Sequence, residues 1–71
     1  MAPDEIARRF TYHAPHGNQP ARYERIRDAA RFLAEDVVEL TPESREQSLA
    51  ITALEEAVFW ANAAIARRER S

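Results

Sequence analysis

The sequence contains no cysteine, no lysine and a single glycine. Without cysteine, the chain forms neither disulfides nor Cys-ligated zinc sites, which are two common ways of stabilising a small domain. It has no uninterrupted apolar run of 18 residues and no signal-peptide pattern at its start. Alanine makes up 14 of the 32 hydrophobic residues in a chain of 71, so few large side chains remain for a core. We therefore expect a soluble, intracellular protein that is stabilised by helix packing or by self-association.

The absence of lysine means that all ten basic residues are arginine. The planar guanidinium group binds phosphate through forked hydrogen bonds, whereas an ammonium group acts as a point charge. The formal net charge of −2 speaks against general binding of duplex DNA, which usually requires a strongly basic surface. The charge is unevenly distributed: the balance is +2 over residues 1–31, −6 over residues 32–66 and +2 over residues 67–71.

A short helix is predicted near the start of the chain, over about residues 3–10. Pro3 suits a first helical turn, acidic residues follow it, and Arg8 and Arg9 come near the end, an order that complements the helix dipole. Residues 11–19 contain a proline and the only glycine and show no helical period. This segment is predicted to be a loop.

Two long helices are predicted in the rest of the chain, over about residues 20–40 and 42–69. Apolar residues recur three and four positions apart in both segments. Thr41 suits an N-cap and Pro42 suits a first helical residue, so one helix ends and the next begins within a few residues. So short a connection makes the helices antiparallel neighbours. The predicted fold is all-α, a single helical-hairpin domain over residues 1–71.

The last predicted helix has a wider apolar face than one neighbouring helix covers. One stripe consists mainly of large aliphatic residues, and a second stripe, one position earlier, consists of alanines and Trp60. Surplus apolar surface on so short a chain indicates self-association, because a single hairpin has no other place to bury it. We therefore predict a homo-oligomer of helical hairpins.

Antiparallel folding places arginines from both long helices at the open end of the hairpin, and acidic residues crowd the turn end. The loop with Tyr12 and His13 enters the second helix at the open end. Arginine forks beside aromatic faces suit a phosphorylated ligand that carries a base. Two other interpretations fit the same residues: a solvated charged face, or basic ends that pair with acidic ends of neighbouring copies. Tyr12 alone also fits a core anchor.

The residue pattern indicates neither catalysis nor a resident metal or cofactor. His13 and His16 form an H-x-x-H pair but have no third ligand in register. Ser44 is predicted to lie at the opposite end of the hairpin from both histidines. Glu55 and Glu56 are adjacent and therefore point to different sides of a helix, so they do not form a facing carboxylate pair. We predict no catalytic residues, no metal ligands, no cofactor and no enzyme activity.

Four stretches, in this order and spread over nearly the whole chain, resemble the helical-hairpin domain that phage anti-CBASS cyclic-nucleotide sponges share with anti-Thoeris sponges. They are I-A-R-R-F-T-Y-H-A-P at residues 6–15, R-Y-E-R-I-R at 22–27, S-R-E-Q-S-L-A-I-T-A-L-E-E-A at 44–57 and W-A-N-A-A-I-A-R at 60–67. No single stretch is specific, but the combination at domain length is. The resemblance implies a homohexamer that sequesters cyclic nucleotide messengers of host antiphage defence without cleaving them.

The resemblance also implies where ligands bind. Cyclic dinucleotides such as cGAMP would lie between protomers, with Tyr12 of the Y-H-x-P motif stacking on a base and His13 beside it. A basic residue early in the second helix would hold phosphate, and Arg27 matches that position best, with Arg25 as the alternative. Lysine is more familiar there, so arginine is a departure. Cyclic trinucleotides would bind at a separate threefold site that is lined by Arg67 or Arg68.

From this resemblance we expect the partners to be cyclic dinucleotides, cyclic trinucleotides and further copies of the chain, with no DNA and no membrane. The protein would be phage-encoded, act in the host cytoplasm and block CBASS immunity. Two alternatives stay open: a sponge for cyclic ADP-ribose isomers, as in the anti-Thoeris branch, and a structural or adaptor helical oligomer.

Overall fold

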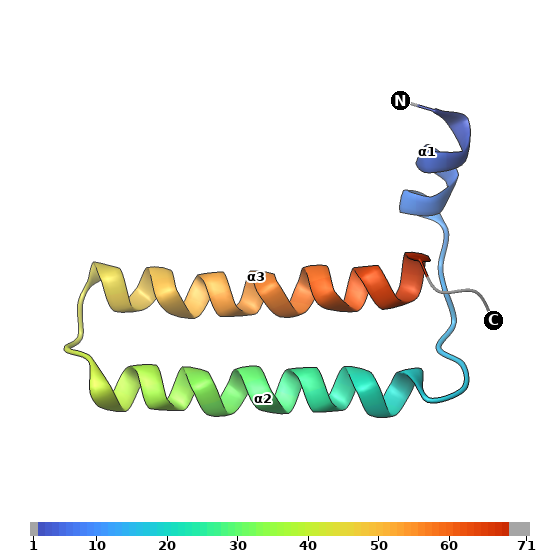
Figure 1. Ribbon diagram of the computed structural model, residues 1–71. Helices are drawn as coiled ribbons and strands as arrows, with labels where there is room; N and C mark the ends of the chain where they lie inside the picture. The colour runs from blue at the N-terminus through green and yellow to red at the C-terminus, as the bar shows by residue number, and fades with distance from the viewer. Residues whose placement is uncertain (1, 69–71) are drawn as a thin grey trace.

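The computed structural model describes residues 2–68, which are all-helical and contain no strand. The helices are α1 (Pro3–Phe10), α2 (Gln19–Leu40) and α3 (Arg45–Arg68). Figure 1 shows α2 and α3 side by side and antiparallel, with α1 standing away from them at the open end of the hairpin. The prediction of an all-helical chain is therefore confirmed. The last position of the predicted third helix, residue 69, lies outside the described residues.

Each of the first two helices has a proline in its first turn, where the missing backbone N–H leaves no hydrogen bond unmade. In α1 the acidic residues Asp4 and Glu5 lie in the first turn, and Arg8 and Arg9 lie in the last. These charges complement the partial charges at the two helix ends. The short α1 thus depends on its own end charges, because none of its residues is buried.

The turn between α2 and α3 differs from the prediction, since α3 begins at Arg45 and not at Pro42. Thr41 caps the end of α2: its backbone N–H donates to the Val37 carbonyl at 3.1 Å, and its hydroxyl donates to the same oxygen at 2.6 Å. Ser44 caps the start of α3, because its Oγ accepts a hydrogen bond from the Gln47 N–H at 3.1 Å. The Gln47 amide also donates to the Thr41 carbonyl at 3.1 Å. These bonds hold residues 42–44 in the turn.

Most of the large apolar side chains are exposed in the single chain. Of the described residues, only Ile65 and Gln19 are buried, at 8% and 3% exposure. The side chains of Phe32, Phe59 and Trp60 are each more than half exposed. Within residues 2–68 nothing covers these side chains, and exposed apolar surface on this scale indicates an interaction surface.

By length and composition alone, α3 is a candidate membrane span, with a mean hydropathy of 1.3 over its most apolar 18 residues. Two observations explain this composition without a membrane. Glu55 and Glu56 lie near the middle of α3, where a charged side chain costs about 3 kcal/mol in a bilayer. In addition, a helix that packs between protein subunits needs an apolar surface of the same kind.

Replacing Ser44 by alanine removes the side-chain cap of α3. We expect the free energy of unfolding of Ser44→Ala to fall by about 1 kcal/mol, the usual effect of losing a serine cap. Urea denaturation followed by circular dichroism, at one protein concentration, measures this change. Ser48→Ala is the matched control, because Ser48 lies inside α3, where alanine favours the helix. Equal stability of the parent and Ser44→Ala would contradict the assignment of the cap.

Candidate functional site

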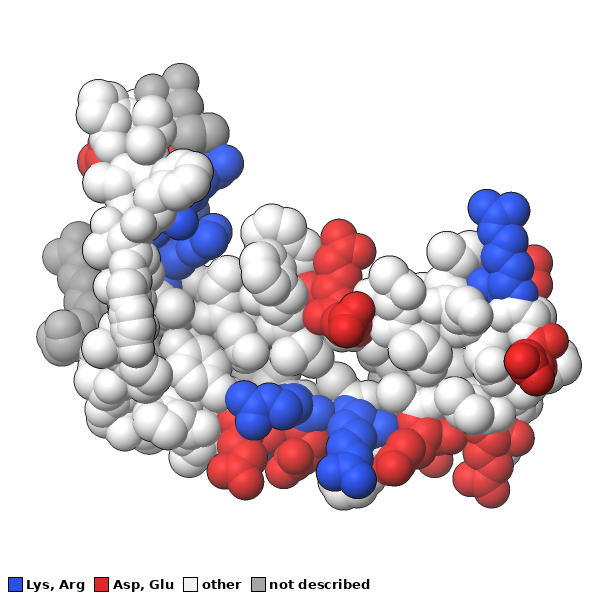
Figure 2. Space-filling model, turned by 180° about the vertical axis from the view of Figure 1, so that it is seen from behind, with Lys and Arg blue, Asp and Glu red and all other residues white. Residues whose placement is uncertain are grey.

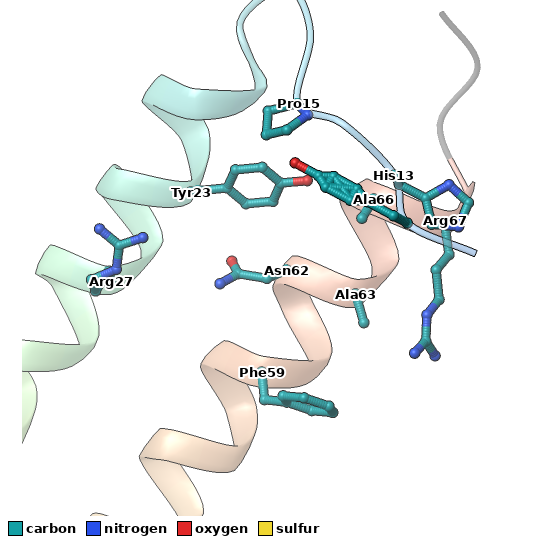
Figure 3. Close-up of a pocket in the computed structure, with 10 residues that line it drawn as sticks. His13, Pro15, Tyr23, Arg27, Phe59, Asn62, Ala63, Ala66 and Arg67 are labelled. Carbon is teal, nitrogen blue, oxygen red and sulfur yellow. The ribbon is translucent and has the colours of Figure 1, made fainter. Parts of the chain in front are cut away.

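An open pocket of about 420 Å³ lies where the loop after α1 meets the open end of the hairpin (Figure 3). Three segments contribute to its wall: the loop, the first half of α2 and the last third of α3. Aromatic, guanidinium, imidazole and amide groups therefore lie around one space. The lining residues are Tyr12, His13, Pro15, Tyr23, Arg27, Phe59, Asn62, Ala63, Ala66 and Arg67.

The loop is held over the hairpin by Gln19, the first residue of α2 and the most buried polar residue described. Its Oε1 accepts a hydrogen bond from the His16 N–H at 3.2 Å, and its Nε2 donates to the Ile65 carbonyl at 3.4 Å. Gly17 lies between the loop and the start of α2 and has a φ of 56°, a left-handed conformation that glycine adopts without strain. The tight turn at Gly17 thus leads the chain from the loop directly into α2.

Tyr12 and His13 occupy this loop in different ways. The Nε2 atom of His13 lies 3.1 Å from the Arg8 carbonyl oxygen at the end of α1. Because a carbonyl only accepts, Nε2 carries the proton in this bond, and the imidazole is fixed against α1. The Tyr12 side chain is 75% exposed, so its ring presents a free face at the pocket. That exposure is inconsistent with a role for Tyr12 as a core anchor in the single chain.

The pocket contains Arg27 and not Arg25. Two positions apart on a helix, these side chains point to different sides, and Arg25 is not among the lining residues. Arg27 lies one helical turn after Tyr23, and both line the α2 side of the pocket in Figure 3. Within residues 2–68, no carboxylate lies within ion-pair distance of Arg27, so its guanidinium group is available to an anionic ligand.

A second pocket, of about 310 Å³, lies between α1 and the end of α3. Arg9, Arg67 and Arg68 line it together with Glu5 and Trp60, and two alanines complete the wall. Arg67 lines both pockets. Figure 3 shows that its guanidinium group is directed away from Arg27. The two arginines expected at a trinucleotide site thus lie together in a basic pocket that adjoins the Tyr12 pocket and shares Arg67 with it.

Glu5 is the one carboxylate among the described residues that line the second pocket, and it pairs with three arginines. Its oxygens lie 2.6 Å from Arg8, 3.3 Å from Arg9 and 3.5 Å from Arg68. The hydrogen bond from Arg9, and then the positive charges of Arg68 and Arg8, hold the pKa of Glu5 below its usual 4.5, although desolvation partly opposes them. Because Arg68 belongs to α3, this carboxylate ties α1 to the hairpin.

The separation of charge is less complete than predicted. Figure 2 shows basic side chains beside α1, but it also shows basic and acidic side chains alternating along the edge formed by α2. Arg31, in the middle of α2, pairs with Glu35 at 3.8 Å. The reason is the length of α2: its arginines extend over several turns and do not all reach the open end. The arginines of the two pockets carry the positive charge of the site.

Asn62 is a pocket residue that the sequence analysis did not assign to the site. It projects from α3 toward α2, between Tyr23 and Arg27 in Figure 3. Its Oδ1 is buried and has no hydrogen-bond partner in the described part of the chain. Phe59, one turn earlier, also lines the pocket and contacts Trp60 edge to face, with ring centroids 5.0 Å apart. Among residues 2–68, no group of three or more His, Asp or Glu side chains is placed to hold a metal ion.

These features define a small helical-hairpin binding domain with basic pockets at one end, one of them also aromatic. A family model described as the Acb2/Tad1 hairpin domain matches residues 2–66, and the chain belongs to this family. Neither a curated protein nor a solved structure matches the chain. Membership implies a phage anti-defence protein that acts as a sponge for cyclic nucleotide messengers, a role that suggests binding rather than catalysis. The resemblance drawn from the sequence is confirmed.

The ion pairs of Glu5 predict that the docking of α1 depends on pH. A carboxyl group whose pKa is lower in the folded state contributes stability above its unfolded value, and this contribution is lost as the pH falls through the lowered pKa. We therefore expect α1 to be docked at pH 6 and to loosen below pH 4.5. The backbone amide shifts of α1, followed by NMR from pH 6 to pH 3, measure this change.

The variant Glu5→Gln is the control for this titration, since it keeps the shape of the side chain and removes the charge. It should show the loosened α1 at every pH. If the parent and the variant show the same shifts at pH 6, Glu5 does not hold α1 in place.

Proposed function

We propose that this protein sequesters cyclic dinucleotides such as cGAMP in the Tyr12 pocket and cyclic trinucleotides in the second pocket, without cleaving either. Acting in the host cytoplasm, it would remove the messengers that activate CBASS immunity. A protein of this kind works by mass action, so it needs affinity and abundance and no catalytic groups. The family assignment supports the class of ligand, and the two pockets support the division between ligands.

One observation carries the proposal: the exposed ring of Tyr12 lines the same pocket as the guanidinium group of Arg27, which has no ion-pair partner within residues 2–68. A cyclic dinucleotide offers the two complementary groups, a base with a π-face and a phosphodiester anion. Stacking on an aromatic ring contributes about 1–3 kcal/mol per base. A hydrogen bond to a charged group contributes about 1.5–3 kcal/mol. The pocket volume of about 420 Å³ also falls within the usual range for small-molecule sites.

We further propose a homohexamer in which copies of the chain complete both pockets. The exposed side chains of Phe32, Phe59 and Trp60 supply the apolar surface that such an assembly requires. Both pockets are open in the single chain, so a second copy is able to close them over a ligand. In a threefold arrangement, one arginine from each of three chains would face one phosphate of a cyclic trinucleotide.

We predict that cyclic dinucleotides raise the melting temperature of the parent, and that Tyr12→Ala and Arg27→Ala lose most of this shift. Each substitution removes one of the contacts above, so the dissociation constant should rise at least about fivefold for Tyr12→Ala and at least about tenfold for Arg27→Ala. A thermal-shift panel of cyclic dinucleotides, cyclic trinucleotides and cyclic ADP-ribose isomers, followed by titration calorimetry, measures the effect.

The matched control is Arg25→Ala, which removes an arginine from the same helix but outside the pocket and should bind as the parent does. Light scattering should give the same mass for every variant and reports the number of chains in the assembly. Ligand recovered after denaturation should be chemically intact, and release of linear nucleotide would contradict sequestration. Stabilisation by cyclic ADP-ribose isomers alone would move the protein to the anti-Thoeris branch.

The second pocket is tested by Arg67→Ala and Arg68→Ala, which should lose cyclic trinucleotides and retain cyclic dinucleotides. Although Arg67 lines both pockets, its guanidinium group is directed away from Arg27, so the dinucleotide should keep its phosphate contact. Titration of both ligands against both variants measures this separation. Equal loss of the two ligands would show that the pockets form one site.

A further inference from the structure

The Oδ1 atom of Asn62 is a buried acceptor in the Tyr12 pocket that no residue within 2–68 satisfies. An acceptor that has lost water and gained no partner destabilises the structure, so native proteins seldom retain one without a reason. Because Asn62 lines the pocket, a bound ligand is a natural source of the missing donor.

Asn62 also differs in chemistry from the other polar groups that line this pocket. Arg27 and Arg67 are donors only and suit phosphate. The Nε2 of His13 is already bound to the Arg8 carbonyl. An amide, by contrast, offers a donor and an acceptor side by side in one plane. Figure 3 places this amide between Tyr23 and Arg27, projecting from α3 toward α2.

We propose that Asn62 recognises the base of a bound cyclic dinucleotide and gives the pocket a preference for adenine. An asparagine amide matches adenine in a bidentate manner: Nδ2 donates to N7, and Oδ1 accepts from the N6 amine. Tyr12 would hold the face of the base while Asn62 reads its edge. Because Oδ1 is buried, the amide must turn about χ2 to present it, and this torsion is soft in asparagine. The inference rests on the proposed function, since it assumes that this pocket holds the dinucleotide.

The test compares cyclic di-AMP with cyclic di-IMP, in which the N6 amine of each base is replaced by an oxygen. That edge then presents two acceptors, which a single amide does not satisfy. We expect the parent to bind cyclic di-AMP about 5- to 150-fold more tightly, the discrimination that one bidentate pair provides. In Asn62→Leu the ratio of the two dissociation constants should fall to about one. Titration calorimetry measures both constants for each protein.

Two further variants keep this test decisive. Asn62→Ala removes both the donor and the acceptor of the amide and places a residue that favours a helix, so it should lose the preference even if Asn62→Leu fails to fold. Thr52→Val is a matched polar-to-apolar change on α3 outside the Tyr12 pocket, and it should keep the parent ratio. Circular dichroism and light scattering confirm that each variant retains its helices and its assembly.

A parent that binds both ligands equally, or an Asn62→Ala variant that keeps the parent ratio, would overturn the inference and leave the proposed function standing. A parent that binds neither these ligands nor any other cyclic dinucleotide would overturn both, because the pocket would then have a different occupant. The two failures are therefore distinguished by whether the parent binds a cyclic dinucleotide at all.

Discussion

The Gln19 amide is the interaction on which the binding end of this small protein depends. It joins the loop and the start of α2 to the distant end of α3, because it accepts from the His16 N–H in the loop and donates to the Ile65 carbonyl of α3. The Gln19 side chain is only 3% exposed, so its hydrogen bonds are shielded from water. Leaving either its oxygen or its nitrogen without a partner would destabilise the fold. This link ties the end of the loop to α3 and so helps to place Tyr12 beside the hairpin. A polar side chain, and not an apolar core, thus organises the site.

The apolar residues act mainly outside the single chain. Ile65 is the only buried hydrophobic residue within residues 2–68, whereas Phe32, Phe59 and Trp60 lie largely in solvent. A chain of this size has too little core to be stable without additional contacts, and contacts between copies supply them in the proposed assembly. Ligand binding and stability would then share one surface, because Phe59 lines the Tyr12 pocket and is also one of the exposed apolar side chains.

The helices were predictable from the sequence because they follow local rules. The turn was not predictable, since its geometry depends on which of two capping residues begins the next helix. Apolar spacing and the prolines predicted three helices, but Thr41 and Ser44 are both good N-caps, and only the bonds made by Gln47 show which one begins α3. At the site, placing Tyr12, His13 and Arg27 together requires only the hairpin topology and the loop. The role of Asn62 depends on the burial of a single oxygen, for which periodicity gives no signal.

The turn at residues 41–44 has a practical consequence for studying this protein. It lies at the opposite end of the hairpin from both pockets, and a helix of 22 residues spans about 33 Å. Pro42 and Glu43 are exposed and belong to neither pocket. A fluorophore or short epitope attached at residue 43 would therefore report on the protein from a distance without touching the ligand, which makes this turn a suitable position for a messenger biosensor.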